Sequence, residues 1–318
     1  MEFGVQVWDE GLSETGNTPQ AMARVTQAAE RLGFDHVWIN DHVITPVSQE
    51  RSYYPIGGAP WPLPPTAEVH DPLAVLAMLG AVTERIRIGT STLVLPLRAP
   101  LPTIKSLITI DHVSSGRLTL GFAPGWWREE FEILGVPWEA RGKVTDEYLV
   151  VFTLACGGGI HDYQGEHVSF ESVPFFPPSV QQPRIRMVSC GTSRRALIRG
   201  ARYDGVFRIL TPVDEVRAFV DQLRAEAERV GNDPERVKLY DFQAIMITDD
   251  ISTQFEGVAD LPLVGPADKL LDVIAAYEGA GMHQLVSGFT SDPFGSTTEQ
   301  LDNMEQFATE VMGPYRGQ

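Results

Sequence analysis

The chain is poor in cysteine, in positive charge and in long apolar runs, and each shortage excludes a class of protein. Its 318 residues include two cysteines, Cys156 and Cys190, which lie 34 residues apart and outside any CxxC spacing. They cannot build a disulfide framework or, alone, a zinc site, so we expect a reducing, cytoplasmic setting. No run approaches 18 uninterrupted apolar residues, and we expect no transmembrane helix. The opening MEFGVQVW is strand-like and lacks the features of a signal peptide.

Positive charge is the second shortage. The chain carries 25 Lys and Arg against 42 Asp and Glu, a formal net charge of −17. This balance argues against nucleic acid or an anionic membrane as the main partner. It favours a protein that binds a small-molecule substrate in a pocket. An anionic ligand would then need local positive features that act against the global field.

Motifs for metals and dinucleotides are also missing. No GxGxxG follows the first apolar run, and neither HxH nor HExxH occurs. Asp41, His42, His70 and Asp71 are potential ligands, but they lack a recognised spacing, so we predict no metal site.

Short apolar runs alternate with longer amphipathic segments along the whole chain. This alternation predicts parallel strands joined by helices. The predicted strands cover residues 3–8, 34–39, 86–91, 118–122, 185–190, 205–210, 237–247 and 284–287. The predicted helices cover 19–32, a segment from 71 onward, 101–114, 142–156, 193–202, 213–230, 266–280 and 297–312. Eight units favour a single (β/α)₈ TIM barrel over residues 1–318, with an insertion at 160–183, rather than a doubly wound open sheet.

Residues that follow the strands are the first candidates for a site, because barrel sites lie at the carboxyl ends of the strands. The stretch VWINDHVITP delivers Asp41 and His42 directly after an apolar run. A histidine can exchange a proton near neutral pH, and an adjacent acid could orient it or bind a ligand. The alternative is a capped turn with a polar loop residue.

Two further strand ends suggest binding of an anion and of a flat ring. In CGTSRRAL, Gly191, Thr192 and Ser193 lead into a helix whose first turn holds Arg194 and Arg195. Arginines oppose the helix dipole there, so they favour a phosphate ligand. In GFAPGWWREE, Gly125 would allow the backbone to approach a ligand closely. Trp126 or Trp127 would offer a flat apolar surface to a ring system. The small residues of GTST, which include Ser91 and Thr92, could lie against the same ring.

These motifs together resemble the luciferase-like monooxygenase superfamily, in particular its F420-dependent oxidoreductase branch. The resemblance extends from FGVQVW through AAERLGFDHVWINDHV, DPLAVLAMLGAVTERIRIGTSTLVLPLRAP and GRLTLGFAPGWWREEFEILGVPWEARG to ARYDGVF. It implies a barrel that holds coenzyme F420, or alternatively FMN, at its mouth.

The resemblance also implies individual roles. Asp41 would contact the deazaflavin region and His42 would be the acid or base. The peptide between Ser91 and Thr92 would be a cis bond that supports the ring. The remaining cofactor contacts would come from Gly125, Trp126, Glu129, Gly191, Thr192, Ser193, Arg194 and Arg195.

Two departures bear on the substrate. Sugar-phosphate dehydrogenases of this family place a glutamate where Trp126 stands, and they use lysines after the sixth strand. Here that stretch begins with Arg208 and contains no lysine. With Trp8, Trp61 and Trp126 as pocket walls, an apolar or natural-product substrate fits better. Relatives are commonly dimers, so we expect a homodimer. The alternatives are an FMN-dependent monooxygenase that works with a separate reductase and a non-catalytic flavin-binding protein.

Overall fold

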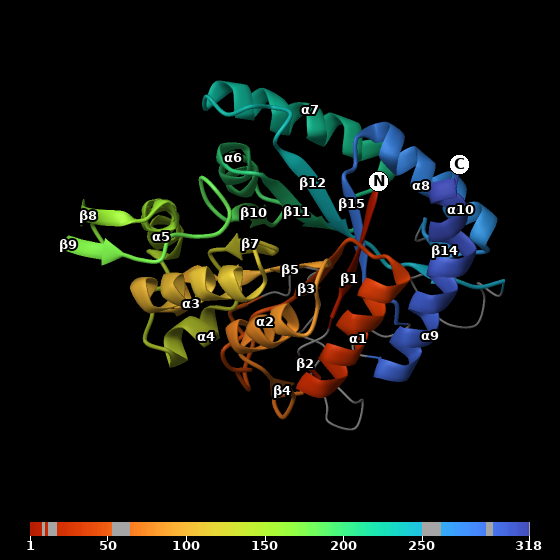
Figure 1. Cartoon of the computed structure of the whole chain (residues 1–318), viewed down its shortest axis with the longest axis horizontal. Helices are drawn as coiled ribbons and strands as arrows, with labels where there is room; N and C mark the ends of the chain where they lie inside the picture. The colour runs from red at the N-terminus through yellow and green to blue at the C-terminus, as the bar shows by residue number, and fades with distance from the viewer. Residues whose placement is uncertain (8–9, 12–17, 53–63, 250–261, 291–294, 318) are drawn as a thin grey trace.

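The computed structural model describes the chain apart from residues 8–9, 12–17, 53–63, 250–261, 291–294 and 318 (Figure 1). Eight parallel strands form a closed barrel, which confirms the predicted fold class. They are β1 (Glu2–Gln6), β3 (His36–Ile39), β5 (Arg87–Thr90), β7 (Leu118–Ala123), β10 (Arg186–Cys190), β11 (Gly205–Ile209), β12 (Lys238–Phe242) and β15 (Gln284–Ser287). Neighbouring strands pair in this order, and β15 pairs back with β1 to close the barrel.

A helix follows each barrel strand, and the helices surround the strands in Figure 1. They are α1 (Pro19–Leu32), α2 (Pro72–Ala81), α3 (Pro100–Val113), α5 (Arg141–Gly157), α6 (Arg194–Arg202), α7 (Val213–Arg229), α8 (Ala267–Ala280) and α9 (Thr297–Phe307). The predicted caps are present. Asp71 accepts hydrogen bonds from the first turn of α2, and Gly33 ends α1 in the left-handed conformation at φ 86°.

Short elements decorate this frame. They are β2 (Glu10–Gly11), β4 (Glu68–Val69), β6 (Leu93–Val94), β13 (Met246–Ile247), β14 (Val264–Gly265), a 3₁₀ turn at Leu95–Leu97, α4 (Arg128–Ile133), a π-helical turn at Ala308–Met312 and α10 (Gly313–Gly317). The predicted strand 237–247 is therefore split into two strands, β12 and β13. Of these, β13 pairs with β14 instead of a barrel strand.

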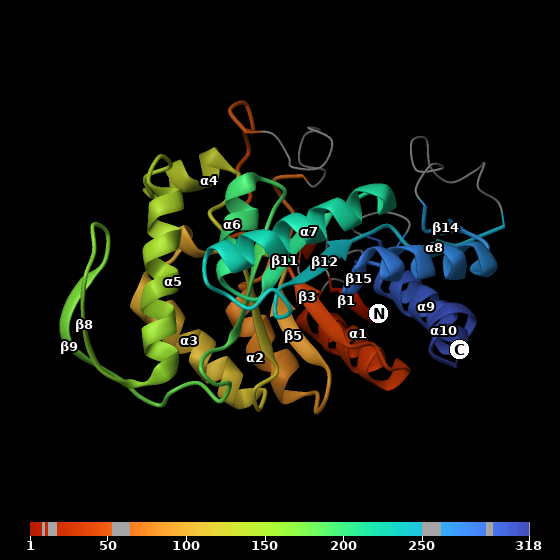
Figure 2. The same ribbon diagram turned by 90° about the horizontal axis from the view of Figure 1, so that it is seen from above.

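The predicted insertion is an antiparallel hairpin. It consists of β8 (Gly159–Gln164) and β9 (Ser169–Phe175), with an irregular register between His161 and Tyr163. Figure 2 shows it along the outer side of α5, away from the barrel interior. The barrel itself is unaffected, because β10 still pairs with β7.

Large side chains fill the inside of the barrel. Trp38, Val188, Phe207, Tyr240 and Val286 form one buried cluster, and the Trp38 indole donates a hydrogen bond to Gln284 Oε1 at 2.8 Å. The barrel is therefore a packed core with two separate ends. Within the described residues, no helix is long and apolar enough to cross a membrane.

Candidate active site at the barrel mouth

The predicted site residues gather at one rim because their strands are parallel and in register. Ile39 of β3 pairs with Thr90 of β5, and Ser189 of β10 pairs with Phe122 of β7. The segments that follow these strands, with Asp41–His42, Ser91–Thr92, Gly125–Trp126 and Gly191–Arg195, therefore leave the barrel at its carboxyl end. Trp8 and Trp61 lie outside the described residues.

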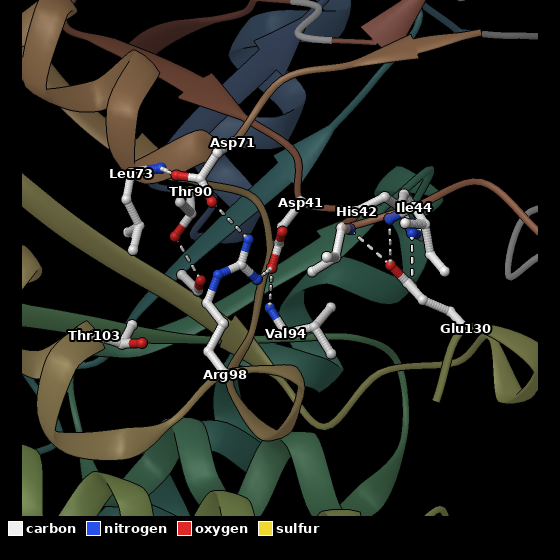
Figure 3. A network of polar contacts seen from close by, with 12 residues as sticks. Asp41, His42, Ile44, Asp71, Leu73, Thr90, Val94, Arg98, Thr103 and Glu130 are labelled. Carbon is white, nitrogen blue, oxygen red and sulfur yellow. Dashed lines mark hydrogen bonds and ion pairs between the residues drawn. The ribbon is translucent and has the colours of Figure 1, made fainter. Parts of the chain in front are cut away.

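His42 is buried against a carboxylate that the sequence did not single out. Its Nδ1 lies 3.0 Å from Glu130 Oε2, and the two side chains are only 7% and 2% exposed (Figure 3). The other oxygen of Glu130 accepts the backbone N–H of Val43 at 2.7 Å. Trp126 and Trp127 meet the imidazole edge-on, with ring centroids 5.9 and 5.2 Å away. The ring of His42 therefore has a fixed orientation in an aromatic surrounding.

Asp41 forms a buried ion pair with Arg98, and the side chain of Asp41 is 0% exposed. Its Oδ2 accepts Arg98 Nη1 at 2.6 Å and the Val94 N–H at 2.8 Å (Figure 3). Arg98 also reaches Asp71, the cap of α2, at 3.2 Å. Burial raises the pKa of Asp41 above its ordinary value, although Arg98 and the Val94 N–H act in the opposite direction. Asp41 Oδ1 is buried without a hydrogen-bond partner, so one acceptor remains unused.

Ser91 links three strand ends, but the peptide bond after it is not the predicted one. Its hydroxyl donates to Gln6 Oε1 at 2.6 Å, and its N–H donates to Ile39 O at 2.7 Å. Within the described residues the cis peptide bonds precede Pro177 and Pro183. The expected cis bond between Ser91 and Thr92 is therefore wrong for this structure. The local backbone is held by these hydrogen bonds with a trans peptide.

Gly125 occupies a position where a side chain would not fit, and its contact with the cofactor stays a prediction. Its φ is +93°, and a Cβ there would lie 2.7 Å from Phe131 and 2.8 Å from Val94. Glycine is thus required by the backbone turn and by packing below the loop. Trp126 stacks on the buried Trp127 at 4.9 Å and 15° and is itself half-buried.

Glu129 uses its carboxylate to hold the segment after His42. It accepts the N–H of Arg51 at 2.7 Å and a hydrogen bond from the Ser52 hydroxyl. Burial tends to raise the pKa of Glu129, but these hydrogen bonds outweigh it and the pKa is lowered. Glu130 and Glu129, both on α4, therefore bind residues 42–52 at two points. A direct cofactor contact from Glu129 stays a prediction.

The predicted anion site is exposed at the start of α6. Ser193 caps the helix by accepting the Ala196 N–H at 3.2 Å, and Gly191 through Arg195 are exposed to solvent. Gly191 has φ +125°, and a Cβ there would meet only Ala196 at 3.7 Å. The segment thus offers open backbone, a helix N-terminus and two arginines, a set that suits a phosphate group.

Arg208, predicted for the substrate pocket, is half-buried on β11 with its guanidinium 4.4 Å from the centre of the Phe219 ring. Its strand neighbour Asp241 is fully buried. Burial raises the pKa of Asp241 to about 7, against hydrogen bonds from Thr211 and Gln243. Within the described residues, no group of three or more His, Cys, Asp or Glu could hold a metal ion.

The family model for luciferase-like monooxygenases matches residues 1–254. The chain belongs to this family. An uncharacterized protein of Mycobacterium tuberculosis is 31% identical to this luciferase-like protein over 284 residues, 87% of this chain and 96% of that one. The FMNH₂-dependent dimethylsulfone monooxygenase of Pseudomonas putida is 26% identical over 167 residues, 51% of this chain and 46% of that one.

A solved structure supports the same fold. The coenzyme F420-dependent tetrahydromethanopterin reductase of Methanopyrus kandleri superposes with a TM-score of 0.77 at 17% identity and covers 99% of both chains. The proteins similar to this luciferase-like oxidoreductase thus include one named for coenzyme F420, which shares the fold, and one named for FMNH₂.

Three functional candidates were missed in the sequence of this luciferase-like protein: Glu130, Arg98 and Gln6. Each pairs with a residue far away in the chain, and His42 and Glu130 are 88 positions apart. One signal for Glu130 was available. The run WWREE follows a barrel strand and so belongs to the same rim as Asp41–His42.

Replacing Glu130 with glutamine is expected to lower turnover roughly 10- to 100-fold, because a hydrogen bond to a charged group contributes about 1.5–3 kcal/mol. The matched control is Glu132→Gln, two residues away, which removes exposed ion pairs to Arg51 and Arg128. Wild-type turnover in Glu130→Gln would contradict a positioning role.

Proposed function

We propose that the protein is an F420-dependent oxidoreductase that moves a hydride between coenzyme F420 and a small, apolar organic substrate, with His42 as the proton partner. The observation that carries the proposal is the buried His42–Glu130 pair at the tip of β3. A histidine that only served as a loop residue would have no need of a carboxylate partner that is itself 2% exposed.

The pair selects which nitrogen of His42 exchanges the proton. With Glu130 3.0 Å from Nδ1, the favoured tautomer carries its hydrogen on Nδ1 and donates it to the carboxylate. Nε2 is then the atom that takes a proton from the substrate hydroxyl or returns one to it. Glu130 stabilises the imidazolium form after the proton has arrived, so it acts as a positioning residue.

The mouth offers partners for both ends of a deazaflavin. The exposed segment from Gly191 to Arg195 suits the phosphate of the side chain, and Asp41 Oδ1 is an unused acceptor beside His42. When bound, the deazaflavin would supply the site that gives or accepts the hydride. The half-buried Trp126 would add an apolar wall, and Ser91 and Thr92 would lie below the ring.

Titration of the apoprotein with F420 and with FMN, followed by fluorescence, tests the cofactor. We expect F420 to bind more tightly than FMN, and we expect the double replacement of Arg194 and Arg195 by glutamine to weaken F420 binding at least tenfold. The control is Arg24→Gln on the exposed face of α1. Tight FMN binding without F420 binding would overturn the proposal in favour of an FMN-dependent monooxygenase, for which the Pseudomonas putida relative is the precedent.

A further inference from the structure

The barrel has a polar cavity at the end opposite to His42. Its volume is about 470 Å³, within the range of about 300–1,000 Å³ typical of small-molecule sites. Four of its lining residues are the first residues of barrel strands: Glu2, Arg87, Arg186 and Lys238. The cavity therefore lies at the amino-terminal rim. The packed side chains around Trp38 separate it from the mouth.

Positive charge dominates this cavity. The lining contains five Arg or Lys side chains and two carboxylates, in a chain whose net charge is −17. The carboxylates already have partners. Asp204 binds Arg184 and lies 3.3 Å from Arg236, and Glu2 lies 3.4 Å from His283. The local excess of positive charge is thus not neutralised within the cavity.

The remaining cations are Arg87, Arg186 and Lys238, and none has a carboxylate partner within 4.0 Å among the described residues. Arg87 is half-buried, and its Nε is buried without a hydrogen-bond partner. Burial lowers the pKa of Arg87, and the neighbouring charge of Arg186 lowers it further. Arg186 has one weak contact, from Nη1 to the Tyr240 hydroxyl at 3.4 Å. Keeping like charges together away from water costs free energy, which a bound anion would recover.

The positive charges of the cavity also affect the pKa of the buried His36. It is fully buried, stacks on Trp38 at 3.9 Å, and neither of its ring nitrogens has a hydrogen-bond partner. Burial holds the pKa of His36 well below its ordinary value, and the charges of Arg87 and Arg186 lower it further. The ring of His36 therefore stays neutral and adds no further positive charge beside Arg87 and Arg186.

We propose that this cavity is a second binding site, for a phosphorylated small molecule with at least two negative charges. Guanidinium groups bind phosphate oxygens through pairs of charge-assisted hydrogen bonds, and neither Arg87 nor Arg186 forms an ion pair within 4.0 Å with an acid among the described residues. Lys238, two residues before Tyr240 on β12, adds a third positive charge to the lining. The cavity is larger than one phosphate requires, so it suits a diphosphate or a phosphorylated organic ligand.

Calorimetric titration in a phosphate-free, low-salt buffer tests the site with three probes: orthophosphate, pyrophosphate and ADP. We expect pyrophosphate to bind more tightly than orthophosphate. Tighter binding of ADP than of pyrophosphate would assign the site to a nucleotide, and the reverse would assign it to the inorganic ion. In Arg87→Gln and Arg186→Gln, affinity for the tighter probe should fall at least tenfold.

Two matched variants locate the binding. Arg24→Gln removes an exposed arginine from α1 and should bind the probe within twofold of the wild type. Arg195→Gln removes one from the mouth, so it should lose only probe binding at the mouth and keep the binding that Arg87→Gln loses. The proposal is overturned if the wild type binds none of the probes, if Arg87→Gln binds as well as the wild type, or if Arg195→Gln alone abolishes binding. Each of these results would leave the assignment of F420 to the mouth intact.

Folding is checked by thermal unfolding. Arg87→Gln should unfold at the same temperature as the wild type or a higher one, because repulsion from Arg186 is relieved. If Arg87→Gln unfolds at a lower temperature, probe binding is measured in Lys238→Gln instead. Lys238 makes no side-chain hydrogen bond or ion pair among the described residues, so its replacement should not affect folding. Weaker binding in Lys238→Gln would then support the site, and unchanged binding would overturn it.

Discussion

Replacing His42 with alanine is expected to lower the turnover number about 10²- to 10⁴-fold, the usual contribution of a positioned acid or base. Cofactor affinity should change less than threefold, because the argued role of Nε2 is to exchange a proton. The measurement is the rate at which deazaflavin absorbance changes with an organic substrate that the wild type turns over. Fluorescence titration of the cofactor into the same variant gives its cofactor affinity.

The control for His42→Ala is His167→Ala. His167 lies between β8 and β9 of the hairpin, and its N–H donates a hydrogen bond to Glu147 of α5. It should retain the wild-type rate. Wild-type turnover in His42→Ala would remove the proton-transfer role. Loss of cofactor binding with an unchanged single-turnover rate would turn His42 into a binding residue.

The second large effect concerns stability. Arg98→Met is expected to lower the free energy of unfolding by about 3–5 kcal/mol, because it leaves the buried carboxylate of Asp41 with the Val94 N–H as its one partner among the described residues. Methionine keeps much of the side-chain volume, so the lost charge dominates. Urea unfolding at pH 5 and pH 8 gives the measurement.

The pH dependence of Arg98→Met has a definite sign. The pKa of Asp41 is raised in the folded protein even with Arg98 present, and removing the guanidinium raises it further. A raised folded-state pKa contributes stability that is present at acid pH and lost as pH rises. The deficit of Arg98→Met should therefore be smaller at pH 5 than at pH 8.

Two comparisons isolate the buried charge. Adding Asp41→Asn to Arg98→Met should recover much of the stability, because no unpaired charge then remains. Arg128→Met, which breaks exposed pairs with Glu132 and Glu139, should cost less than about 1 kcal/mol. An equal deficit at both pH values would contradict the assignment of the effect to Asp41.

The barrel was predictable because its signal is local. Each strand and helix has its own periodicity and caps, such as Gly33 after α1 and Asp71 before α2, and eight units leave few ways to arrange a parallel sheet. The position of Asp41 and His42 at the mouth follows from the same logic. The split of 237–247 was not predictable, because the apolar run continues while the strand pairing changes from β15 to β14.

The contacts inside the site are the part that sequence could not supply. Glu130 was not among the predicted site residues, and only the folded chain brings it to His42. Arg98 stands 57 residues from Asp41, and nothing in either local pattern indicates the pair. The packing at Gly125 was not predictable for the same reason, since the neighbours that exclude a side chain, Phe131 and Val94, come from other segments.

The manner in which α4 holds residues 42–52 has a consequence for engineering. Glu129 and Glu130 accept hydrogen bonds from the main-chain N–H groups of Val43, Ile44 and Arg51. A main-chain N–H is the same whatever side chain it carries, proline excepted. The path of this segment should therefore survive randomisation of its exposed positions, such as Val47, which is 85% exposed. A library built there would vary one border of the mouth while the His42–Glu130 pair stays in place.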